Sequence, residues 1–423
     1  MVQRFRDRSS LIKGTLDLSW QCAESENMRH ALIVGGGIGG LFSAICLRLT
    51  GWNVQVLEQA PALQDIGAGI QVSPNGTRLL QATGVYPHIE RTSVSPEAIE
   101  LRNGLSGRVF CTVPLGEYAV RRWGAPYIHI HRADFITALK TRLFELQPDA
   151  LVLQAQLTDF TQNARTVSAT VADGRVFEAD ILIGADGVHS FVRQQMFGQD
   201  KPSFTGNVAY RAVVHREKLG DMSVPMTASV WTGAAKHAVT TNVRGGDLVN
   251  FVGVVEQDAV GHESWSQNID RTIAQYAFRD FHPLVRLILA KADHVGCWPL
   301  LTREPLRHWS EGRVILLGDS AHPMLPSMAQ GGVQSLEDGY VLAHSLRNSE
   351  NIEQSAYIYF QTRINRVSRI QAQSAANLRL YHHRSRLSQL MRYVPLEIAS
   401  RTTPSLIYRQ LDWVMKQTYP PLF

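Results

Sequence analysis

The stretch of the sequence richest in reactive side chains is GDSAHPMLPSMAQGG, residues 318–332, in which Asp319, Ser320 and His322 fall within four positions. A hydrolytic triad works because its three side chains converge from separate segments into a chain of hydrogen bonds. Side chains on neighbouring backbone units do not converge in that way, so their contiguity argues against a nucleophile. The apolar run RVILL before the stretch predicts a buried strand, and the residues after it have helical spacing. Asp319 is therefore expected where a strand ends, which is where α/β folds bind ligands.

A second chemical signal is the glycine-rich turn in HALIVGGGIGGLFSAICLRLTGWNVQVLEQA, residues 30–60. Gly35, Gly37 and Gly40 match GxGxxG between an expected strand and an expected helix, the context that dinucleotide binding requires. Glu58 follows the next expected strand, where a carboxylate accepts hydrogen bonds from a ribose hydroxyl and repels a 2′-phosphate. The segment predicts an ADP moiety with a free 2′-hydroxyl. Nicotinamide and flavin both remain open for the other half of the cofactor.

Two further strands end in the same way. FEADILIGADGVHSFVRQQMFG, residues 177–198, predicts a strand that ends at Gly184 and Asp186, then a helix that carries Arg193. It lies roughly 150 residues after the first strand, as if the chain leaves a sheet and later rejoins it. GRVILLGDSAH is a third such strand, again ending in Gly-Asp.

With these motifs in order, the chain resembles the single-component (group A) FAD-dependent aromatic hydroxylases, in their branch like salicylate hydroxylase and 6-hydroxynicotinate 3-monooxygenase. The resemblance runs from Met28 to Leu346. It rests on GGGIGG with Glu58, IGAGIQVSPNGTRLL, HIHRADF, GADGVHSFVR, AYRAVV and GDSAHPMLPSMAQGG. Each motif alone is weak, but their combination and order are specific.

The resemblance implies an α/β fold with a Rossmann-like FAD-binding domain of the glutathione reductase and p-hydroxybenzoate hydroxylase type. A substrate domain built on an antiparallel sheet is inserted into it, and helices follow. The expected boundaries are 28–100, 130–200 and 295–350 for the FAD-binding domain, 101–129 and 201–294 for the substrate domain, and 351–423 for the C-terminal helices. Residues 1–27 are expected to be a disordered arm, because they carry no long apolar core and precede the first strong strand.

The resemblance also implies which residues hold FAD, which is expected to bind tightly and without a covalent bond. Asp319 would accept a hydrogen bond from a ribityl hydroxyl, and the helix beginning near Gly331 and Gly332 would direct its N-terminal N–H groups at the isoalloxazine ring. Arg132 would contact the flavin cofactor and the backbone of Leu157 the adenine. The remaining expected cofactor-binding residues are Gly35, Gly37, Gly40, Glu58, Gln59, Gly69, Gln71 and Asp186.

The substrate side is expected in residues 200–300, where β-patterned runs are separated by the turns GAAK and RGGD. Tyr210, Arg211 and His237 are the candidate catalytic residues, and Arg211 is suited to attract a carboxylate. Strand alternation puts His237, Val239 and Thr241 on one face. His237 either points into the substrate pocket or is only hydrogen-bonded within the sheet.

The implied reaction uses NADH or NADPH and O2 to hydroxylate a small phenolic or N-heteroaromatic carboxylate through a flavin C4a-hydroperoxide. No second GxGxxG occurs in residues 200–300, in agreement with a family that lacks a separate NAD(P)H domain. Two alternatives stay open. One is another FAD oxidoreductase of this fold, such as an epoxidase, and the other is a flavin-binding sensor without turnover.

Composition limits the remaining possibilities. The chain has 423 residues with 44% hydrophobic content, enough for a large core. No apolar run reaches membrane-spanning length, so we expect no membrane partner. The four cysteines lack metal or disulfide spacing, which predicts no metal site and a cytoplasmic protein. His382 and His383 are expected to face solvent, because no carboxylates accompany them in the sequence.

The C-terminal segment is basic: residues 361–423 carry ten Lys and Arg against Glu397 and Asp412. Its arginines are spaced through an apolar helical pattern and are not clustered, so a solvated helical face is favoured over nucleic-acid binding. A dimer contact is the next interpretation. The expected assembly is a monomer or a homodimer.

Overall fold

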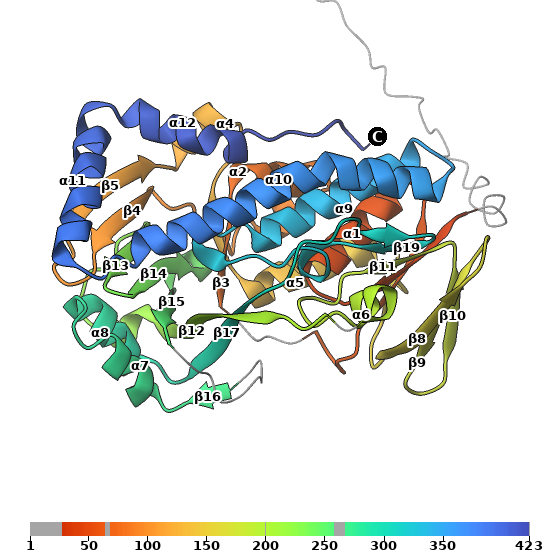
Figure 1. Ribbon diagram of the computed structural model, residues 1–423, viewed down its shortest axis with the longest axis horizontal. Helices are drawn as coiled ribbons and strands as arrows, with labels where there is room; N and C mark the ends of the chain where they lie inside the picture. The colour runs from red at the N-terminus through yellow and green to blue at the C-terminus, as the bar shows by residue number, and fades with distance from the viewer. Residues whose placement is uncertain (1–27, 64–67, 199, 258–266, 423) are drawn as a thin grey trace, which may run out of the picture.

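The computed structural model describes residues 28–63, 68–198, 200–257 and 267–422. The expected arm at residues 1–27 lies outside these ranges. The described chain forms a six-stranded sheet and an eight-stranded sheet, with helices packed against both (Figure 1). The α/β expectation is therefore confirmed.

The six-stranded sheet has the order β18-β19-β11-β1-β2-β7. Its strands are β18 (Ser310–Glu311), β19 (Val314–Leu316), β11 (Ile181–Gly184), β1 (His30–Val34), β2 (Asn53–Leu57) and β7 (Leu151–Val152). All neighbours run parallel except β18 and β19. The central strands are almost continuous apolar runs because helices cover both faces of a parallel sheet. The carboxyl ends of β1, β11 and β19, which carry the three glycine-containing turns, thus lie side by side.

Three helices pack together beside these turns. Helix α1 (Ile38–Leu49) packs against both α5 (Arg132–Leu146) and α9 (Gly331–Arg347). Short elements complete this part of the molecule. They are the ribbon of β3 (Gly69–Val72) and β6 (Ile128–His131), helices α2 (Pro74–Ala82), α3 (Tyr86–Ile89), α4 (Glu117–Trp123) and α6 (Phe191–Phe197), and a sheet of β8 (Leu157–Gln162), β9 (Val167–Val171) and β10 (Val176–Ala179).

The eight-stranded sheet has the order β16-β17-β12-β15-β14-β13-β4-β5. Its strands are β16 (Gln267–Ile269), β17 (Val295–Thr302), β12 (Ser203–His215), β15 (Leu248–Glu256), β14 (Lys236–Val243), β13 (Ala228–Gly233), β4 (Ala98–Asn103) and β5 (Val109–Pro114). All pairs are antiparallel except β13 with β4. The expected domain boundary between residues 100 and 101 falls inside β4, which belongs to this sheet along its whole length.

One face of the eight-stranded sheet is covered by α7 (Arg271–Ala277) and α8 (Pro283–Lys291), seen at the lower left of Figure 1. Their apolar side chains form a second core with Trp231, Phe251 and Phe278. The other face is turned toward the six-stranded sheet. Alternation along each strand therefore sends every second side chain into the space between the two sheets.

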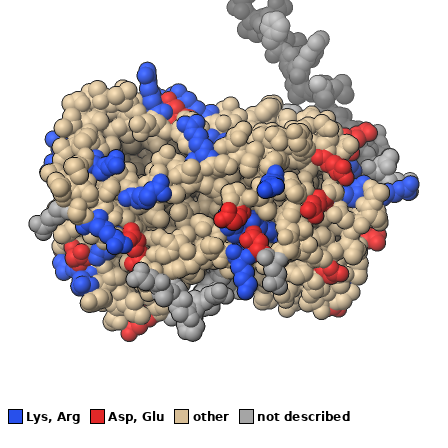
Figure 2. Space-filling model, viewed as in Figure 1, with Lys and Arg blue, Asp and Glu red and all other residues tan. Residues whose placement is uncertain are grey.

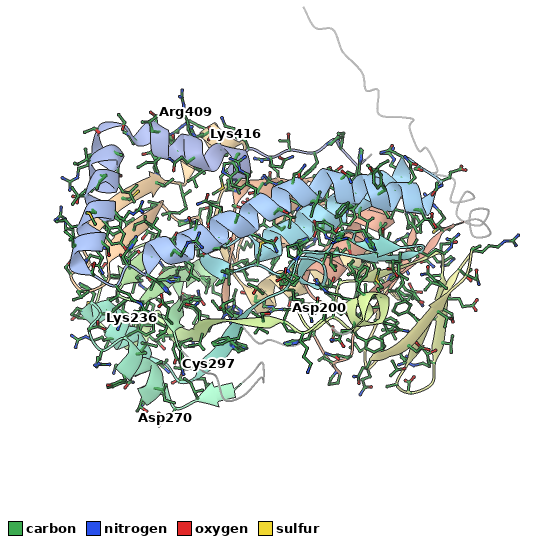
Figure 3. All side chains as sticks on the ribbon, in the orientation of Figure 1. Asp200, Lys236, Asp270, Cys297, Arg409 and Lys416 are labelled. Atoms are coloured by element: carbon green, nitrogen blue, oxygen red, sulfur yellow. The ribbon has the colours of Figure 1, made fainter. Side chains whose placement is uncertain are left out.

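Helix α10 (Ile352–Tyr381) is 30 residues long and runs across the molecule beside α9 (Figure 1). It touches β18 of the first sheet and β13 of the second. Helices α11 (Arg386–Thr402) and α12 (Pro404–Met415) continue onto β5 and α2. The expected solvated face exists, since Arg409 and Lys416 lie exposed on and just after α12 (Figure 3).

The face of α10 that packs against α9 is buried and carries charge. Arg363 is fully buried and donates to Glu337 Oε2 at 2.5 Å and to Asp338 Oδ1 at 2.7 Å, both on α9. Arg366 adds a bond of 2.7 Å to Glu337. This ion cluster fixes α10 to α9.

The expectation that His382 faces solvent is wrong. His382 is 6% exposed and ends α10 against the turn between β13 and β14 of the eight-stranded sheet. Helical spacing alone did not reveal this, because the strands that cover His382 are distant in the sequence.

On the face shown in Figure 2, lysines and arginines are scattered and form no single continuous patch. Among the described residues, no helix combines the length and apolar character needed to cross a bilayer. Within the same ranges, no group of three His, Cys, Asp or Glu side chains is arranged to hold a metal ion.

Candidate active site

Two adjoining cavities lie between the carboxyl ends of the six-stranded sheet and the inner face of the eight-stranded sheet. Their volumes are about 1010 Å³ and 370 Å³. Both are lined by Gly37, Arg132, Arg211 and Asp319. Ligand pockets of globular proteins usually measure about 300–1,000 Å³. The combined space therefore suits a large ligand together with a small one.

The glycine-rich turn borders both cavities. Gly35 has φ of 109°, and a Cβ there would lie 2.5 Å from the carbonyl oxygen of Ala185. A Cβ at Gly40 would lie 1.9 Å from the oxygen of Gly35, so the turn and α1 pack without room for a side chain. At Gly37 a Cβ would meet nothing within 4 Å. Gly37 thus leaves free space in the cavity at the N-terminus of α1, where no side chain caps the helix.

Glu58 lies at the end of β2 and lines the larger cavity with Gln59. Its carboxylate accepts hydrogen bonds from the backbone N–H of Gly36 at 2.7 Å and of Ala60 at 2.9 Å. These bonds hold the carboxylate beside the turn. Its other lone pairs stay available for hydroxyl donors, because a carboxylate accepts up to about four hydrogen bonds.

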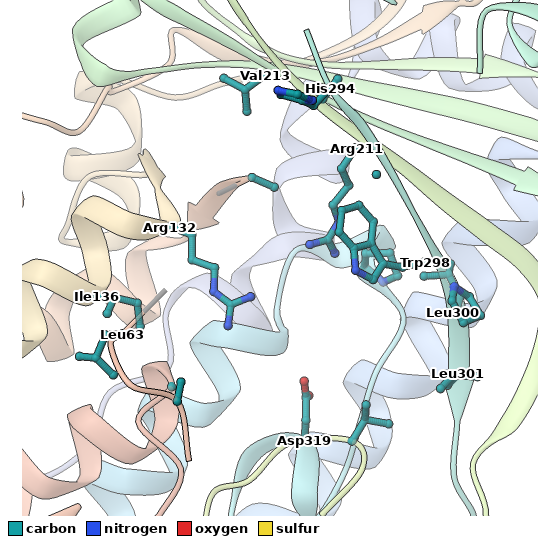
Figure 4. Close-up of a pocket in the computed structure, with 18 of the residues that line it drawn as sticks. Leu63, Arg132, Ile136, Arg211, Val213, His294, Trp298, Leu300, Leu301 and Asp319 are labelled. Atoms are coloured by element: carbon teal, nitrogen blue, oxygen red, sulfur yellow. The ribbon is translucent and has the colours of Figure 1, made fainter. Parts of the chain in front are cut away.

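Arg132 and Arg211 reach into the same open space from opposite elements (Figure 4). Arg132 begins α5, and burial lowers its pKa although Asp319 opposes this effect. Burial and the charge of Arg132 lower the pKa of Arg211 to about 10. The Nε of Arg211 is buried without a hydrogen-bond partner among the described residues, and its guanidinium lies 5.2 Å from the ring of Trp298. Two cations this close favour an anionic ligand.

The Gly-Asp turn after β19 is held from three sides. The N–H of Gly318 donates to Asp338 at 2.9 Å, and His322 Nε2 lies 2.6 Å from the same carboxylate oxygen. Arg193 donates to the carbonyls of Ser320 at 3.3 Å and Ala321 at 3.1 Å. Asp319 is thereby left exposed to the cavity, which lies deep in the protein.

Desolvation in this cavity raises the pKa of Asp319, against the opposing charges of His322 and Arg132. Beside it, Gly331 and Gly332 line the smaller cavity at the N-terminus of α9, and no side chain caps this helix. A second uncapped helix end thus faces the site. It favours partial negative charge on a ligand.

Four expected cofactor residues do not line either cavity: Gly35 and Gly40, which pack inside the turn, and Asp186 and Leu157. The carboxylate of Asp186 accepts from the hydroxyl of Ser190 at 2.5 Å and the N–H of Val192 at 3.1 Å, so it holds the start of α6. Leu157 is buried at the start of β8, in the three-stranded sheet. The strand that follows α5 in the six-stranded sheet is β7. The loop between α5 and β8 hides from the sequence pattern which strand joins the six-stranded sheet.

Tyr210, predicted as a catalytic residue, does not line either cavity. Tyr210 precedes Arg211 on β12, and successive side chains of a strand point to opposite faces. Arg211 faces the cavities, whereas Tyr210 packs against Phe278 in the core under α7 and α8. Burial there raises its pKa to about 12. Tyr210 therefore supports the sheet from behind.

His237 lines the smaller cavity together with Val239, as strand alternation predicts. Its Nδ1 lies 2.7 Å from Nε2 of His382, which leaves Nε2 as the nitrogen available to the cavity. Burial and the neighbouring His382 lower the pKa of His237 well below its usual value. The ring is neutral at neutral pH and can accept a proton. Thr241, the next residue of this face, instead accepts from Asn250 at 3.1 Å.

Gly69 and Gln71 line the smaller cavity on β3. The N–H of Gly69 donates to Asn250 Oδ1 at 2.7 Å, which ties β3 to the inner face of the eight-stranded sheet. Gln71 Oε1 accepts from the hydroxyl of Tyr127 at 2.8 Å. The amide of Gln71 is thus oriented by a buried neighbour.

Sequence reasoning missed Asn250, Trp298 and His382 as parts of the site. Asn250 had a detectable signal, because Leu248, Asn250, Val252 and Val254 alternate on β15 and all line the cavities. Trp298 and His382 had none. Each depends on which distant segment packs beside it.

The residues around the larger cavity fit a dinucleotide. Gly37 leaves a cradle that a Cβ would fill, α1 presents uncapped N–H groups, and Glu58 presents carboxylate oxygens for ribose hydroxyls. The second uncapped helix end at α9 and Asp319 lie at the other side of the shared space. The N-terminus of α1 suits a pyrophosphate, and the carboxylates of Glu58 and Asp319 suit the hydroxyls of two sugar chains. The N-terminus of α9 suits a ring that carries partial negative charge.

A family model described as FAD binding domain matches residues 28–358. The chain belongs to this family. It is 35% identical over 351 residues to 6-hydroxynicotinate 3-monooxygenase of Pseudomonas fluorescens, which covers 82% of this chain and 90% of that protein. It is 33% identical to 3-hydroxybenzoate 6-hydroxylase of Polaromonas naphthalenivorans over 386 residues, 90% of this chain and 94% of that protein.

Among solved structures, a salicylate hydroxylase substrate complex superposes with a TM-score of 0.75 at 25% identity, covering 93% of this chain and 97% of that one. The resemblance seen in the sequence motifs is confirmed. This member of the family is a FAD-dependent monooxygenase like salicylate hydroxylase, and NADH or NADPH is the co-substrate typical of such hydroxylases.

Proposed function

We propose that this monooxygenase hydroxylates a small aromatic carboxylate that carries a ring hydroxyl or a ring nitrogen. The observation that supports this most strongly is that Arg211, a half-buried cation whose Nε has no hydrogen-bond partner among the described residues, and His237, a neutral imidazole, line the same cavity of about 370 Å³. The proposal fits the names of the relatives, which act on hydroxynicotinate and hydroxybenzoate.

Arg211 is the proposed anchor for the substrate carboxylate. A planar guanidinium binds a carboxylate through two parallel hydrogen bonds, which also fixes the orientation of the ring. The guanidinium of Arg211 is supported by Trp298 and is otherwise short of partners. Binding an anion there relieves the repulsion between Arg211 and Arg132.

His237 is the proposed general base. Its Nε2 would accept the proton of a ring hydroxyl, which makes the ring more electron-rich at the carbon to be hydroxylated. The neighbouring cavity walls are apolar, with Val239, Val252 and Val254 beside His237. They exclude water, which protects reactive species from side reactions.

FAD is proposed to occupy the larger cavity and the shared space, held by Gly37, Glu58, Gln59, Arg132 and Asp319, with Gly331, Gly332, Gly69 and Gln71 near its ring end. When bound, it supplies the transfer of electrons from the nicotinamide and the activation of O2. Asp186 and Arg193 position the turns that contact it. In this proposal the six-stranded sheet serves the cofactor and the eight-stranded sheet forms the wall of the substrate cavity.

The test is oxidation of NADH and NADPH by the purified FAD-loaded protein, with O2, across salicylate, hydroxybenzoates, hydroxynicotinates and non-aromatic controls. We expect one aromatic acid to accelerate oxidation and to yield one hydroxylated product by mass spectrometry. Bound FAD whose reduction no aromatic acid stimulates would contradict the proposal and support a sensor. An epoxide formed from an alkene among the non-aromatic controls would instead support an epoxidase.

We further propose a cytoplasmic monomer or homodimer. In the described ranges, Cys46, Cys111 and Cys297 are all free thiols, which suits a reducing compartment. A homodimer would have an exposed apolar stripe of α11 to bury, formed by Leu387, Leu390, Met391, Val394 and Ile398. Light scattering of the purified protein distinguishes the two assemblies.

A further inference from the structure

A chain of three titratable side chains leads from the smaller cavity to the surface. His237 Nδ1 lies 2.7 Å from His382 Nε2, and His382 Nδ1 lies 3.1 Å from Glu256 Oε1. The two imidazole rings have centroids 4.9 Å apart. Both distances are within hydrogen-bond reach, so the chain is continuous from one end to the other.

Exposure rises along the chain. His237 is 2% exposed and borders the cavity, and the side chain of His382 is 3% exposed. The side chain of Glu256 is 29% exposed and pairs with Arg384, whose side chain is 76% exposed. The cavity end is thus shielded from bulk water, whereas the far end is in contact with it.

The fold brings these three residues together by backbone contacts as well. His237 on β14 is paired with Val254 on β15, and Glu256 lies two residues further on the same face. His382 follows α10, and its carbonyl accepts from the N–H of Ala235 at 3.4 Å. The N–H of Glu256 donates to the carbonyl of Ala235 at 2.9 Å. The turn before β14 therefore fixes all three segments.

We propose that His382 and Glu256 relay to solvent the proton that His237 takes from the substrate. This inference rests on the proposed role of His237 as the base. It assigns a function to a C-terminal residue outside the sequence motifs that mark the family.

The transfers balance without any change in electrons. In the starting tautomers, His237 and His382 both carry hydrogen on Nδ1, and Glu256 is a carboxylate. The substrate proton binds His237 Nε2, the Nδ1 proton of His237 moves to His382 Nε2, and the Nδ1 proton of His382 moves to Glu256. Glu256 then releases it to water. When the product hydroxyl is reprotonated, the same chain carries one proton inward and restores both tautomers.

The neighbouring charges favour this path. Burial lowers the pKa of His382, and the carboxylate of Glu256 opposes that effect. Burial acts to raise the pKa of Glu256, but hydrogen bonds from Arg384 and His382 lower it overall. Lys236, next to His237, donates instead to Asp280 at 2.5 Å. Tyr381 packs its ring 5.2 Å from His237, and His383 faces Tyr393.

On the cavity side, His237 shares its surroundings with Arg132, Arg211 and Asp319. Burial and the neighbouring His382 both disfavour a proton held on His237. A path that removes the proton therefore helps to keep the substrate deprotonated.

The experiment measures proton release directly, by stopped-flow mixing of FAD-loaded protein with 3-hydroxybenzoate or 6-hydroxynicotinate and phenol red in weak buffer. For Glu256→Gln, which keeps the shape and the hydrogen-bond acceptor, we expect the release rate to fall at least tenfold with affinity within twofold. For His382→Ala we expect a similar loss that added imidazole restores. Glu117→Gln, the same change at an exposed site, should leave the rate unaltered.

The outcomes separate the two proposals. If His237→Gln does not alter proton release, the proposed role of His237 fails. If His237→Gln abolishes release but Glu256→Gln and His382→Ala keep the normal rate, the base stands and the relay is overturned. Loss in His382→Ala that imidazole does not restore, with a normal Glu256→Gln, also overturns it, because that pattern indicates a structural role only.

Discussion

Arg211 holds its charge in a place where burial and a second guanidinium both act against it. Such a group is costly to keep in a ligand-free protein, because a buried charge without a partner loses its hydration. The arrangement is reasonable where a ligand supplies the missing anion. At the scale of single residues, the two main features of the site are therefore the guanidinium of Arg211, which lacks an anionic partner, and the Nε2 lone pair of His237.

Replacing Arg211 with Gln tests the anchor. We expect KM for the aromatic acid to rise at least tenfold, which corresponds to about 1.4 kcal/mol, because the carboxylate loses its charged partner. Steady-state kinetics over the substrate panel measure this. Arg216→Gln, an exposed arginine just after β12, is the matched control and should leave KM within twofold. An unchanged KM in Arg211→Gln would place the carboxylate elsewhere.

At the scale of elements, the turn between β1 and α1 separates two uses of glycine. Gly40 is needed for packing, because its Cβ position lies 1.9 Å from a carbonyl oxygen. Gly37 has ordinary backbone angles, φ −78° and ψ −175°, and open space where a Cβ would lie. The fold therefore requires a glycine at position 40 but not at position 37, where we propose that the open space takes the cofactor.

This difference predicts opposite behaviour for two small substitutions. Gly37→Ala should fold with a normal thermal midpoint but bind FAD at least tenfold more weakly, measured by flavin fluorescence during reconstitution of the cofactor-free protein. Gly40→Ala should fail to give soluble folded protein. Equal FAD affinity in Gly37→Ala and the parent would show that the cofactor does not approach this position.

The elements also explain which parts of the site the sequence could predict. The segment from β1 to Glu58 was predictable, because its strands, its glycine-rich turn and its helix follow one another directly in the sequence. The choice between Tyr210 and Arg211 was not, since it depends on the phase of β12 relative to its neighbours. Leu157 lines neither cavity, and the sequence could not show this because a loop of uncertain length precedes it. His382 could not be found, because its partner Glu256 lies 126 residues away.

At the scale of the whole molecule, the ion cluster of Arg363 with Glu337 and Asp338 joins the C-terminal helices to the cofactor-binding part. Arg363→Gln would remove the arginine from Asp338 and one of the two arginines from Glu337, which would keep Arg366. Losing one partner of a buried ion pair costs about 3–5 kcal/mol, so for a chain of this length we expect the thermal midpoint to fall by about 3–6 °C. Arg379→Gln, exposed on the same helix, should shift it little. A small shift in Arg363→Gln would refute this role.

The same cluster predicts how stability depends on pH. Burial acts to raise the pKa of Glu337, but Arg363 and Arg366 lower it to about 2 overall. A carboxylate with a depressed folded pKa stabilises the protein above its unfolded pKa of about 4.3 and loses this contribution as pH falls toward 2. The expected contribution is on the order of 3 kcal/mol.

We therefore expect the gap in thermal midpoint between the parent and Glu337→Gln to be constant above about pH 5 and to narrow as pH falls to 3. Differential scanning fluorimetry across that range measures the gap. Glu353→Gln, exposed at the start of α10, should give a small gap that does not vary with pH. A gap for Glu337→Gln that widens toward acid pH would reverse the sign and refute the assignment.

Asp338 receives both Arg363 from α10 and the N–H of Gly318 from the turn beside Asp319. During translation, the strands and turns that contact the cofactor leave the ribosome before Arg363 does. Until then, Glu337 and Asp338 lack the cation that allows them to be buried, and α9 cannot settle behind the turn. Since nascent chains fold from the N-terminus onward, we expect the chain to bind flavin only late in synthesis, after most of α10 has emerged. Cofactor binding would thus require that the polypeptide is almost complete.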